Sequence, residues 1–351
     1  MAEKVLVGMS GGVDSAVSAY LLKQAGYETA GVNCRFFRFE DVFCNKTDTD
    51  VDDARKTAEK MEIPFYVFEF FDEFRENVID NFISTYEKGA TPNPCVVCNK
   101  HLKFGAMLRK AEQEGFDKIA TGHYANIERD TNGRFLLKKG ADITKDQSYV
   151  LYCLNQYQLS HTLFPLGGMT KAEVREIAGA INFVSARKSD SQDICFIPDG
   201  KYADFIQKYS GRIYPDGEFV DMNGRILGTH KGIIRYTVGQ RKGLGLALPA
   251  PMYVKEKDVP GNRVILCDNE TLFTRELDAE DINFIPFDSL DAPLRVKAKT
   301  RYKHTEQWAT VEQTSQNSFH LTFDEPQRAI SKGQSVVLYD GEYVVGGGII
   351  K

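Results

Sequence analysis

Hydrophobic and polar positions follow two different patterns along this chain. From Lys4 to about Ile197, short apolar runs are separated by segments with helical periodicity. The runs predict strands at 5–7, 28–32, 65–70 and 118–123, and the periodic segments predict helices at 16–24, 51–61, 73–86 and 104–113. Strands separated by helices indicate parallel βαβ units, which bind ligands at the carboxyl ends of their strands. We therefore expect an α/β domain built on a parallel sheet.

Beyond residue 198 the pattern becomes that of β structure. Helical periodicity fades after Tyr209, and turn pairs at 216–217, 223–224, 261–262 and 340–341 separate short apolar runs. A shift near Leu272 to Pro286 separates a middle segment from a last set of strands that we expect to close as a small barrel. The prediction is three domains, at 1–203, 204–273 and 274–351.

Composition limits the classes of protein that fit. The chain has 351 residues, 42% of them hydrophobic and 26% charged, which is typical of a soluble globular protein. The sequence has no apolar run of membrane-spanning length and no apolar leader after Met-Ala-Glu-Lys, so we expect a cytoplasmic protein without a membrane partner. The 7 cysteines lack a framework spacing, which favours reduced thiols with a local role. With a net charge of -5, binding to a polyanion would need a basic patch.

The segment from Gly8 to Ser15 follows the first predicted strand and precedes the first predicted helix. Gly11 and Gly12 let a ligand approach the backbone, and the free N–H groups at the helix start favour an anion such as phosphate. The segment has neither the Lys of a Walker A loop nor the glycine spacing of a dinucleotide site. The plain alternative is a strand-to-helix turn in which Ser10 caps the helix.

Cys95 and Cys98 form a C-x-x-C pair after two prolines and before a segment, 99–107, that favours helix. Both thiols are then expected near a helix amino terminus, where the helix dipole and Lys100 would lower their pKa. A structural zinc site would need two more ligands, and the pair does not follow the first strand as a thioredoxin pair does. Cys195, between Ile194 and Phe196, reads from the pattern alone as a small core residue.

Cations alternate with small or apolar residues from Arg295 to Lys303. On one strand this pattern would place five cations on one face over ~26 Å, as a track for phosphates. The alternative is a charged edge strand that faces solvent. Farther upstream, Thr144 to Gln147 has the spacing of a capping box before 148–154.

Residues 10–15 resemble the PP-loop of the N-type ATP pyrophosphatases, which split ATP into AMP and pyrophosphate. Together with further segments in the same order, they resemble the tRNA-specific 2-thiouridylases over almost the whole chain. Those segments are 91–99, 122–125, 145–149, 194–197, 239–245, 300–302 and 346–350. The resemblance implies a PP-loop domain of the adenine-nucleotide α/β hydrolase-like class, a small central β-rich domain and a carboxyl-terminal β-barrel that binds tRNA.

The resemblance also implies site residues. ATP with Mg²⁺ would be bound by Gly8, Met9, Ser10, Gly11, Gly12, Val13, Asp14, Ser15, Cys34 and Gly122. The target base would lie against Asn93, Pro94 and Cys95, and tRNA would contact His123, Lys145, Asp146, Gln147, Arg301, Tyr302 and Gln334. Cys34 stands where many members have Met, and Cys95 where some have Asp.

The implied reaction is 2-thiolation of the wobble uridine in tRNA anticodons. Adenylation of the uracil C2 oxygen would create a leaving group, Cys195 would carry sulfur as a persulfide received from a donor or relay protein, and Cys98 would resolve the intermediate through a disulfide. An alternative is a [4Fe-4S] cluster held by Cys95, Cys98 and Cys195. Two other functions remain open at this point: a PP-loop enzyme that adenylates a small metabolite, and a non-catalytic RNA-binding metal or redox sensor.

Overall fold

The structure is a computed structural model that describes residues 2–38, 40–42, 49–183, 194–197 and 200–351. Contacts within the chain divide it into two compact units. Unit 1 comprises Met1–Val78, Cys95–Phe196 and Gly341–Val345, and unit 2 comprises Ile79–Pro94, Ile197–Asp340 and Gly346–Lys351.

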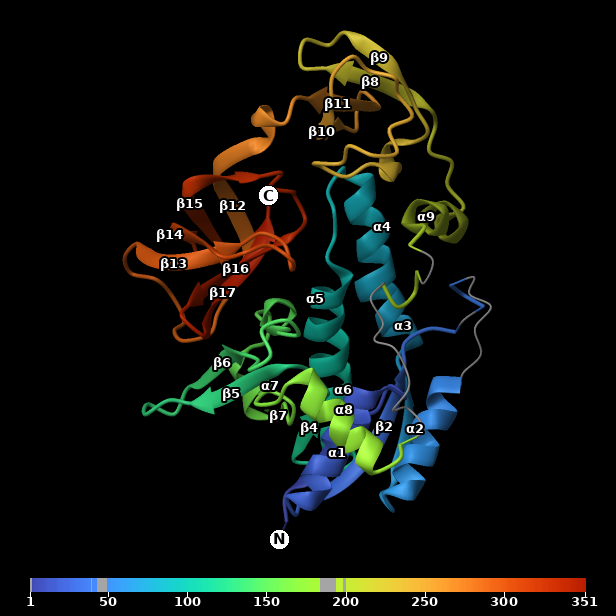
Figure 1. The fold of residues 1–351 in the computed structure, drawn as a ribbon, viewed down its shortest axis with the longest axis vertical. Coiled ribbons are helices and arrows are strands. Elements are labelled where there is room, and N and C mark those ends of the chain that lie inside the picture. The colour runs from blue at the N-terminus through green and yellow to red at the C-terminus, as the bar shows by residue number, and fades with distance from the viewer. Residues whose placement is uncertain (1, 39, 43–48, 184–193, 198–199) are drawn as a thin grey trace. The chain divides into compact units, whose positions relative to one another are not determined.

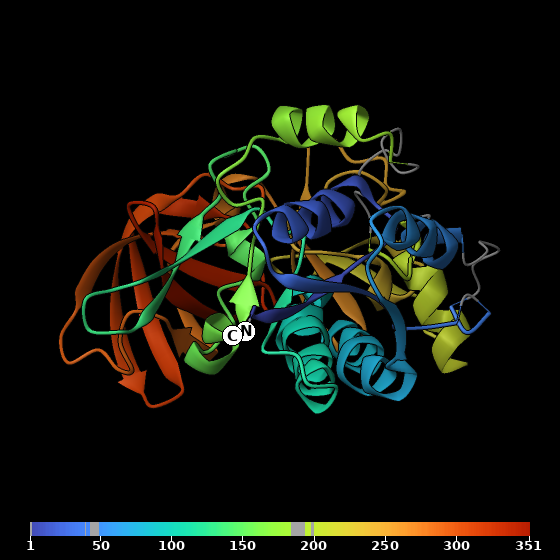
Figure 2. The same ribbon diagram turned by 90° about the horizontal axis from the view of Figure 1, so that it is seen from below.

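Unit 1 contains a parallel sheet with the strand order β3-β2-β1-β4-β7. Its strands are β1 (Lys4–Gly8), β2 (Glu28–Arg35), β3 (Phe65–Glu69), β4 (Lys118–Ala120) and β7 (Thr162–Leu163). One face is covered by α1 (Val13–Gln24), α2 (Thr49–Lys60) and α8 (Lys171–Ala180), as Figures 1 and 2 show. Helices α3 (Phe71–Phe74), α5 (Pro94–Cys98) and α6 (Met107–Gln113) lie on the other face (Figure 2).

The predicted α/β domain is confirmed, because its apolar runs form the centre of this sheet. Val5, Leu6 and Val7 are fully buried, and Ala54 and Ala58 of α2 pack into the same core. The predicted helix at 104–113 begins earlier, at Pro94, and passes through a π-helical stretch at Asn99–Ala106.

Two features of the chain between residues 71 and 163 were not predicted. The helix expected at 73–86 is divided into α3, a π-helical stretch at Arg75–Ile79, and α4 (Asp80–Glu87). A hairpin of β5 (Ala125–Arg129) and β6 (Phe135–Lys139) follows β4, and the short helix α7 (Gln156–Ser160) precedes β7.

The middle of the chain forms a four-stranded sheet in unit 2 with the order β10-β11-β8-β9. It follows α9 (Tyr202–Ser210) and consists of β8 (Gly217–Asp221), β9 (Ile226–His230), β10 (Tyr253–Asp258) and β11 (Arg263–Cys267). The predicted turns at 223–224 and 261–262 connect β8 to β9 and β10 to β11. At the second turn Asn262 adopts φ 48°, a left-handed conformation that Asn tolerates better than most residues.

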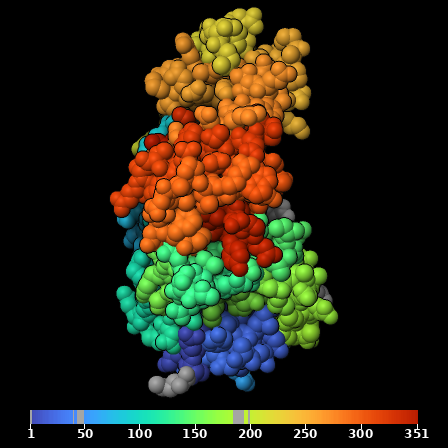
Figure 3. Space-filling view, turned by 90° about the vertical axis from the view of Figure 1, so that its left-hand side faces the viewer, coloured from blue at the N-terminus to red at the C-terminus, as the bar shows by residue number. Residues whose placement is uncertain are grey.

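The predicted barrel is confirmed at the carboxyl end of the chain. Its strands are β12 (Phe273–Phe284), β13 (Leu294–Lys299), β14 (Gln307–Ser315), β15 (Ser318–Arg328), β16 (Ser335–Asp340) and β17 (Tyr343–Ile350). They follow the order β12-β15-β14-β13-β16-β17, and pairing of β12 with β17 closes the ring. Alternate residues such as Val296, Ala309 and Leu321 fill its interior, while its outer surface is orange to red in Figure 3.

Candidate active site

The predicted phosphate loop connects the end of β1 to the start of α1. Strand β1 lies between β2 and β4, so the loop leaves the sheet where the strand order changes direction, the usual ligand position in such sheets. Gly12 is the extended N-cap residue of α1, and no side chain caps the helix. The alternative in which Ser10 caps the helix is therefore wrong. Instead, the backbone N–H of Ser10 donates to Ser15 Oγ at 3.2 Å.

Two glycines are required by close backbone contacts at this loop. Gly11 adopts φ +73°, and a Cβ there would lie 2.6 Å from the carbonyl oxygen of Asp50. Gly122, just after β4, lies against the helix start, because a Cβ there would be 2.9 Å from the Asp14 carbonyl carbon and 3.0 Å from Ser15 N. Met9 and Val13 are buried, so it is their backbone groups that are left to face a ligand.

Asp14 is held by two residues that the sequence pattern did not single out. Lys171 Nζ donates to its two carboxylate oxygens at 2.7 and 2.8 Å, and the hydroxyl of Tyr124 donates at 2.9 Å. Tyr124 lies in the recognised segment 122–125, but Lys171 gave no signal beyond its place after Thr170, the N-cap of α8. A single carboxylate at a phosphate loop suits Mg²⁺, which proteins bind through one or two carboxylates and the substrate's phosphates.

The predicted thiols occupy the start of a helix and a turn. Cys95 and Cys98 lie in α5, with Pro94 as its first residue, so their predicted place near a helix amino terminus is confirmed. Cys195 lies in a turn and is exposed, so its reading as a core residue is wrong. The buried residue is its neighbour Phe196, whose ring packs edge-on against Phe74 with centroids 5.5 Å apart.

Electrostatic interactions place four thiols and one cation in a common neighbourhood. The pKa of Cys195 is raised to about 12 by burial and by the charges of Cys98 and Cys95, while Lys103 opposes the rise. Burial and Cys98 likewise raise the pKa of Cys34 to about 12, and burial raises the pKa of Cys98 to about 11. Although Cys195 has exposed surface, the surrounding protein atoms still desolvate its sulfur.

The expectation of lowered thiol pKa values is therefore wrong for the free protein. Desolvation disfavours the thiolate more strongly than the helix amino terminus favours it, and it also raises the pKa of Cys95. The cation that acts on these thiols is Lys103, one helical turn beyond Cys98 on the same continuous helix, whereas the prediction named Lys100.

The described residues do not fit a metal cluster. Among them, no group of three or more His, Cys, Asp or Glu side chains is arranged to hold a metal ion. The six cysteines within the described ranges, Cys34, Cys95, Cys98, Cys153, Cys195 and Cys267, are free thiols. We derive no step through an iron–sulfur cluster.

Three of the residues predicted to contact tRNA are bonded to protein groups near the hairpin. Asp146 is buried and accepts from the N–H groups of Gly140 and Ser148 at 3.0 and 3.1 Å. Gln147 Oε1 accepts from Tyr124 N at 3.0 Å, and buried His123 contacts Thr121 Oγ1 through Nδ1 at 2.7 Å. Burial and Lys103 hold the pKa of His123 well below its usual range, so the ring is neutral near pH 7.

The capping box predicted at Thr144 is absent from this described segment. Thr144 bonds to Asp142, and residues 148–150 form a 3₁₀ turn whose N-cap, Gln147, makes no side-chain cap. Lys145, which follows Thr144 in the chain, is half-buried.

Gln334 is bonded to the segment that precedes Asn93 and Pro94. Its Nε2 donates to the carbonyl oxygens of Thr91 and Pro92 at 3.1 and 2.9 Å. Thr91 N in turn donates to the carbonyl of Lys332 at 2.8 Å. These contacts within unit 2 fasten the Thr-Pro-Asn-Pro segment to the turn that opens β16.

The basic strand is shorter than predicted. Strand β13 ends at Lys299, so three cations, Arg295, Lys297 and Lys299, alternate with buried residues instead of five. Arg301 lies beyond the strand, and its Nη2 donates to Val238 O, Ala329 O and Ser331 Oγ at 3.1, 3.1 and 2.7 Å. Tyr302 and Lys303 are exposed in the same turn.

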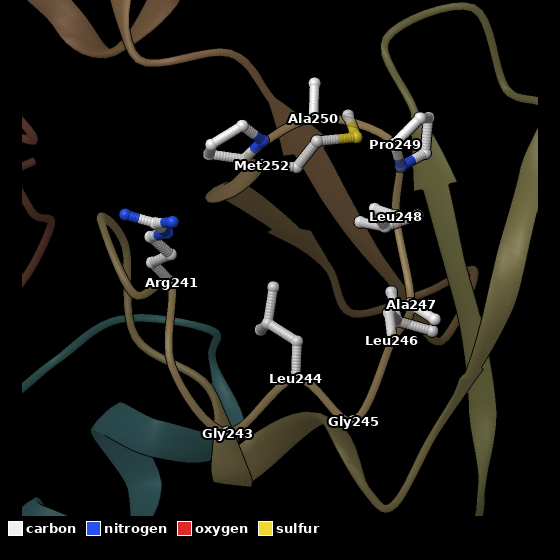
Figure 4. Close-up of a pocket in the computed structure, with 11 residues that line it drawn as sticks. Arg241, Gly243, Leu244, Gly245, Leu246, Ala247, Leu248, Pro249, Ala250 and Met252 are labelled. Carbon is white, nitrogen blue, oxygen red and sulfur yellow. The ribbon is translucent and has the colours of Figure 1, made fainter.

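A pocket of about 600 Å³ lies in unit 2, and none of the site residues discussed above lines it. One stretch of chain from Arg241 to Met252 curves around it, as Figure 4 shows. The residues that line the pocket include most of the recognised segment 239–245. They include none of the predicted cysteines and none of the residues predicted to bind ATP or tRNA. In the ranges that the structure covers, no helix is both long and apolar enough to cross a membrane.

Known families match the chain from end to end. Residues 3–199 match the tRNA methyl transferase HUP domain, 203–268 the tRNA methyl transferase PRC-barrel domain, and 274–350 the aminomethyltransferase beta-barrel domain. A solved structure of the U34-tRNA thiolase NcsA from Methanococcus maripaludis with its [4Fe-4S] cluster covers 59% of this chain and 66% of its own, at 19% identity and a TM-score of 0.35. A likeness that low carries no argument.

Curated relatives are similar over their full lengths. The tRNA-specific 2-thiouridylase MnmA of Clostridioides difficile is 51% identical over 100% of this chain and 99% of its own. The protein named MnmA 2 from Clostridium botulinum is 49% identical over 100% of both chains. The chain therefore belongs to the family of tRNA-specific 2-thiouridylases.

Proposed function

We propose that this protein is a tRNA-uridine 2-sulfurtransferase that thiolates the wobble uridine of tRNA anticodons in the cytoplasm and splits ATP into AMP and pyrophosphate. Its relatives carry that name over the full length of the chain. The proposal rests on two features of unit 1. One is a glycine loop that leads into α1, a helix whose start has no side-chain cap, and the other is a group of neighbouring thiols. The first suits nucleotide activation and the second suits sulfur transfer.

In the first step, the uracil C2 oxygen attacks the α-phosphorus of ATP, and pyrophosphate leaves. The free N–H groups at the start of α1 would stabilise the phosphates, and Gly122 lets the end of β4 approach that helix start closely. Asp14 would help to hold Mg²⁺, which shields phosphate charge when bound. Lys171, the partner of Asp14, would then be released toward the nucleotide.

In the second step, the terminal sulfur of a Cys195 persulfide attacks C2 and AMP leaves with its electron pair. The Cys98 thiolate then attacks the Cys195 sulfur, which releases the thiocarbonyl on uridine and forms a Cys98–Cys195 disulfide. A dithiol reductant would restore both thiols, and a persulfide-bearing donor protein would reload Cys195. Because the pKa of Cys98 is about 11 in the free protein, its proton would be lost after substrate binds.

Most of the proposed substrate contacts come from residues that the resemblance implies. Asn93, Pro94 and Cys95 would flank the target base, and Lys145, Tyr302 and Lys299 would contact tRNA. For Gln334 and Arg301 we propose an indirect role, because their side chains bond to protein carbonyls. His123, Asp146 and Gln147 would likewise shape the site from behind.

The nucleotide step is tested by following radiolabelled ATP. Turnover should yield AMP and pyrophosphate and should require tRNA. Asp14→Asn should lower the rate by about 10²-fold or more, since it would weaken binding of the Mg²⁺ that neutralises charge at the phosphates. Asp130→Asn, at the half-buried carboxylate of the turn between β5 and β6, is the control. Release of ADP and phosphate would refute the PP-loop chemistry, and turnover with a metabolite but not with tRNA would favour a small-molecule adenylating enzyme.

The sulfur step is tested by nucleoside mass spectrometry of the tRNA product. Cys98→Ser and Cys195→Ser should each abolish 2-thiouridine while ATP and tRNA still bind, and Cys267→Ser, a buried thiol of unit 2, should leave the product unchanged. An iron-free Cys95→Asp protein should stay active. Thiolation that disappears together with iron would instead favour a cluster, and an absence of any ATP turnover would favour a binding sensor.

A further inference from the structure

Trp308 is an exposed tryptophan on a firmly held part of the barrel. It lies in β14, directly opposite Lys297 of β13, and 49% of its surface is exposed. Its chain neighbour Ala309 and the next inward residue, Val311, are fully buried. The backbone beneath Trp308 is therefore fixed by the barrel core, and the ring is presented at a defined place on the surface.

Two cations accompany the ring. The Arg295 guanidinium carbon lies 5.1 Å from the ring centroid, and Lys297 Nζ lies 5.2 Å from it. Arg295 forms a two-oxygen ion pair with Asp324, so its charge is largely compensated. Lys297 has no acidic partner among the residues that the structure describes, and its charge is available to a ligand. The patch thus combines an aromatic surface with one uncompensated cation on a chain whose net charge is -5.

We propose that Trp308 stacks on an unpaired base of the RNA substrate while Lys297 binds the adjoining phosphate. An indole contributes 150–250 Å² when buried, so a half-exposed ring leaves much apolar surface for a partner to cover. A flat base beside a phosphate matches an aromatic ring beside a cation, the combination that recurs in single-strand binding sites. A base inside a duplex has both faces already stacked, so the occupant is a loop base. This inference rests on the proposed function, because it takes tRNA as the substrate.

The chain contains one tryptophan, which makes the test direct. Emission of Trp308 is followed while unmodified tRNA transcript is added, with free N-acetyltryptophanamide as the correction for light absorbed by RNA. The expected result is quenching that saturates, with its half-maximal effect at the dissociation constant measured independently by filter binding. A blunt-ended RNA duplex, which has no loop, should not quench.

Variants separate stacking from folding. Trp308→Ala should weaken tRNA binding by about 5- to 100-fold, the effect of losing one stacked base, and Trp308→Phe should restore most of it. Lys297→Ala should lower affinity and flatten its salt dependence while tRNA quenching persists at saturation. Phe273→Ala removes another exposed aromatic of the barrel, on β12, and should change nothing.

Two outcomes would overturn the inference and leave the proposed function standing. The first is that tRNA binds and is thiolated while the emission of Trp308 does not change. The other is quenching by poly-glutamate as strong as by tRNA, which would indicate a patch for acidic peptides. By contrast, failure of tRNA to bind at all would refute the proposed function itself.

Discussion

Cys98 is protonated in the free protein, because burial raises the pKa of its thiol to about 11. The thiolate fraction therefore grows only as the pH rises toward that value. We expect iodoacetamide at pH 7.5 to alkylate Cys98 about 100-fold more slowly in the folded protein than in the urea-unfolded chain. The reason is that the thiol pKa is about 11 in the folded protein and 9.0 ordinarily, a difference of two pH units. Peptide mass spectrometry over time measures both rates.

Lys103 provides the matched test of this electrostatic account. It is the cation that lowers the pKa of Cys95, Cys98 and Cys195, so Lys103→Gln should slow alkylation further. Lys100→Gln removes a charge nearby in sequence and should have a smaller effect. Equal alkylation rates in folded and unfolded chain would contradict the proposed burial of the thiol.

Single residues also show the limits of sequence reasoning. The place of Cys98 on a helix followed from Pro94 and the helical pattern after it. Its interaction with Cys34, whose pKa it helps to raise, could not be predicted because Cys34 is distant in sequence. In the same way, Asp14 could be singled out from its loop. Its partner Lys171 could not, because a lysine after a helix cap is ordinary in any sequence.

At the scale of elements, the turn from Ser331 to Gln334 fastens the Thr91–Pro92 segment in unit 2. Gln334→Ala removes two hydrogen bonds and should lower the free energy of unfolding by about 1–3 kcal/mol and slow thiolation, with little change in tRNA affinity. Thermal unfolding and filter binding measure these effects. Gln327→Ala, at a half-buried position of β15 where it removes one local hydrogen bond, is the control. A loss of tRNA affinity without a loss of stability would make Gln334 a direct contact.

Lys257 of β10 is a buried cation in the same unit. Its Nζ donates to Ala90 O at 3.3 Å and lies 5.5 Å from the Tyr86 ring centroid, and burial lowers its pKa to about 8. The unfolded chain binds this proton more tightly, so the free energy of unfolding should rise with pH between about 8 and 10.5.

Lys257→Met should remove that rise. Because the charged form is disfavoured at pH 7, the variant should also be more stable there by about 1–3 kcal/mol, after the lost bond to Ala90 is taken into account. Urea unfolding at pH 7 and pH 10 measures the difference. Lys242→Met, at an exposed lysine, should leave the profile unchanged, and a destabilised Lys257→Met at pH 7 would show that the bond outweighs the buried charge.

The sequence predicted best those helices and strands whose bounds depend only on the periodicity of hydrophobic residues, without tertiary contacts. The central strands and α1 and α2 match the pattern within a few residues. The end of β13 does not follow from alternation, because Arg301 leaves the ladder to bond with carbonyls of Val238 and Ala329. The π-helical stretch at Asn99–Ala106 likewise leaves no mark in a helical pattern.

For the whole molecule, a net charge of -5 means that tRNA must bind through local cations. Lys299→Ala should weaken tRNA binding and reduce the slope of log affinity against log salt by about 0.7–0.9 if one phosphate contact is lost. Arg301→Ala should instead lower stability with little change in that slope, because its guanidinium binds protein carbonyls. Binding at several salt concentrations and a melting curve distinguish the two, and an unchanged slope for Lys299→Ala would mean that this cation of β13 only faces solvent.

The division of the chain into units has a consequence for how such a protein can evolve. Along the sequence, the chain passes from unit 1 to unit 2 at Ile79 and returns to unit 1 at Cys95. Unit 1 also includes Gly341–Val345, near the carboxyl end. A single recombination event anywhere between those points would join mismatched halves of both units. Exchange of whole modules between genes is therefore obstructed, and we expect the three matched regions to be inherited together.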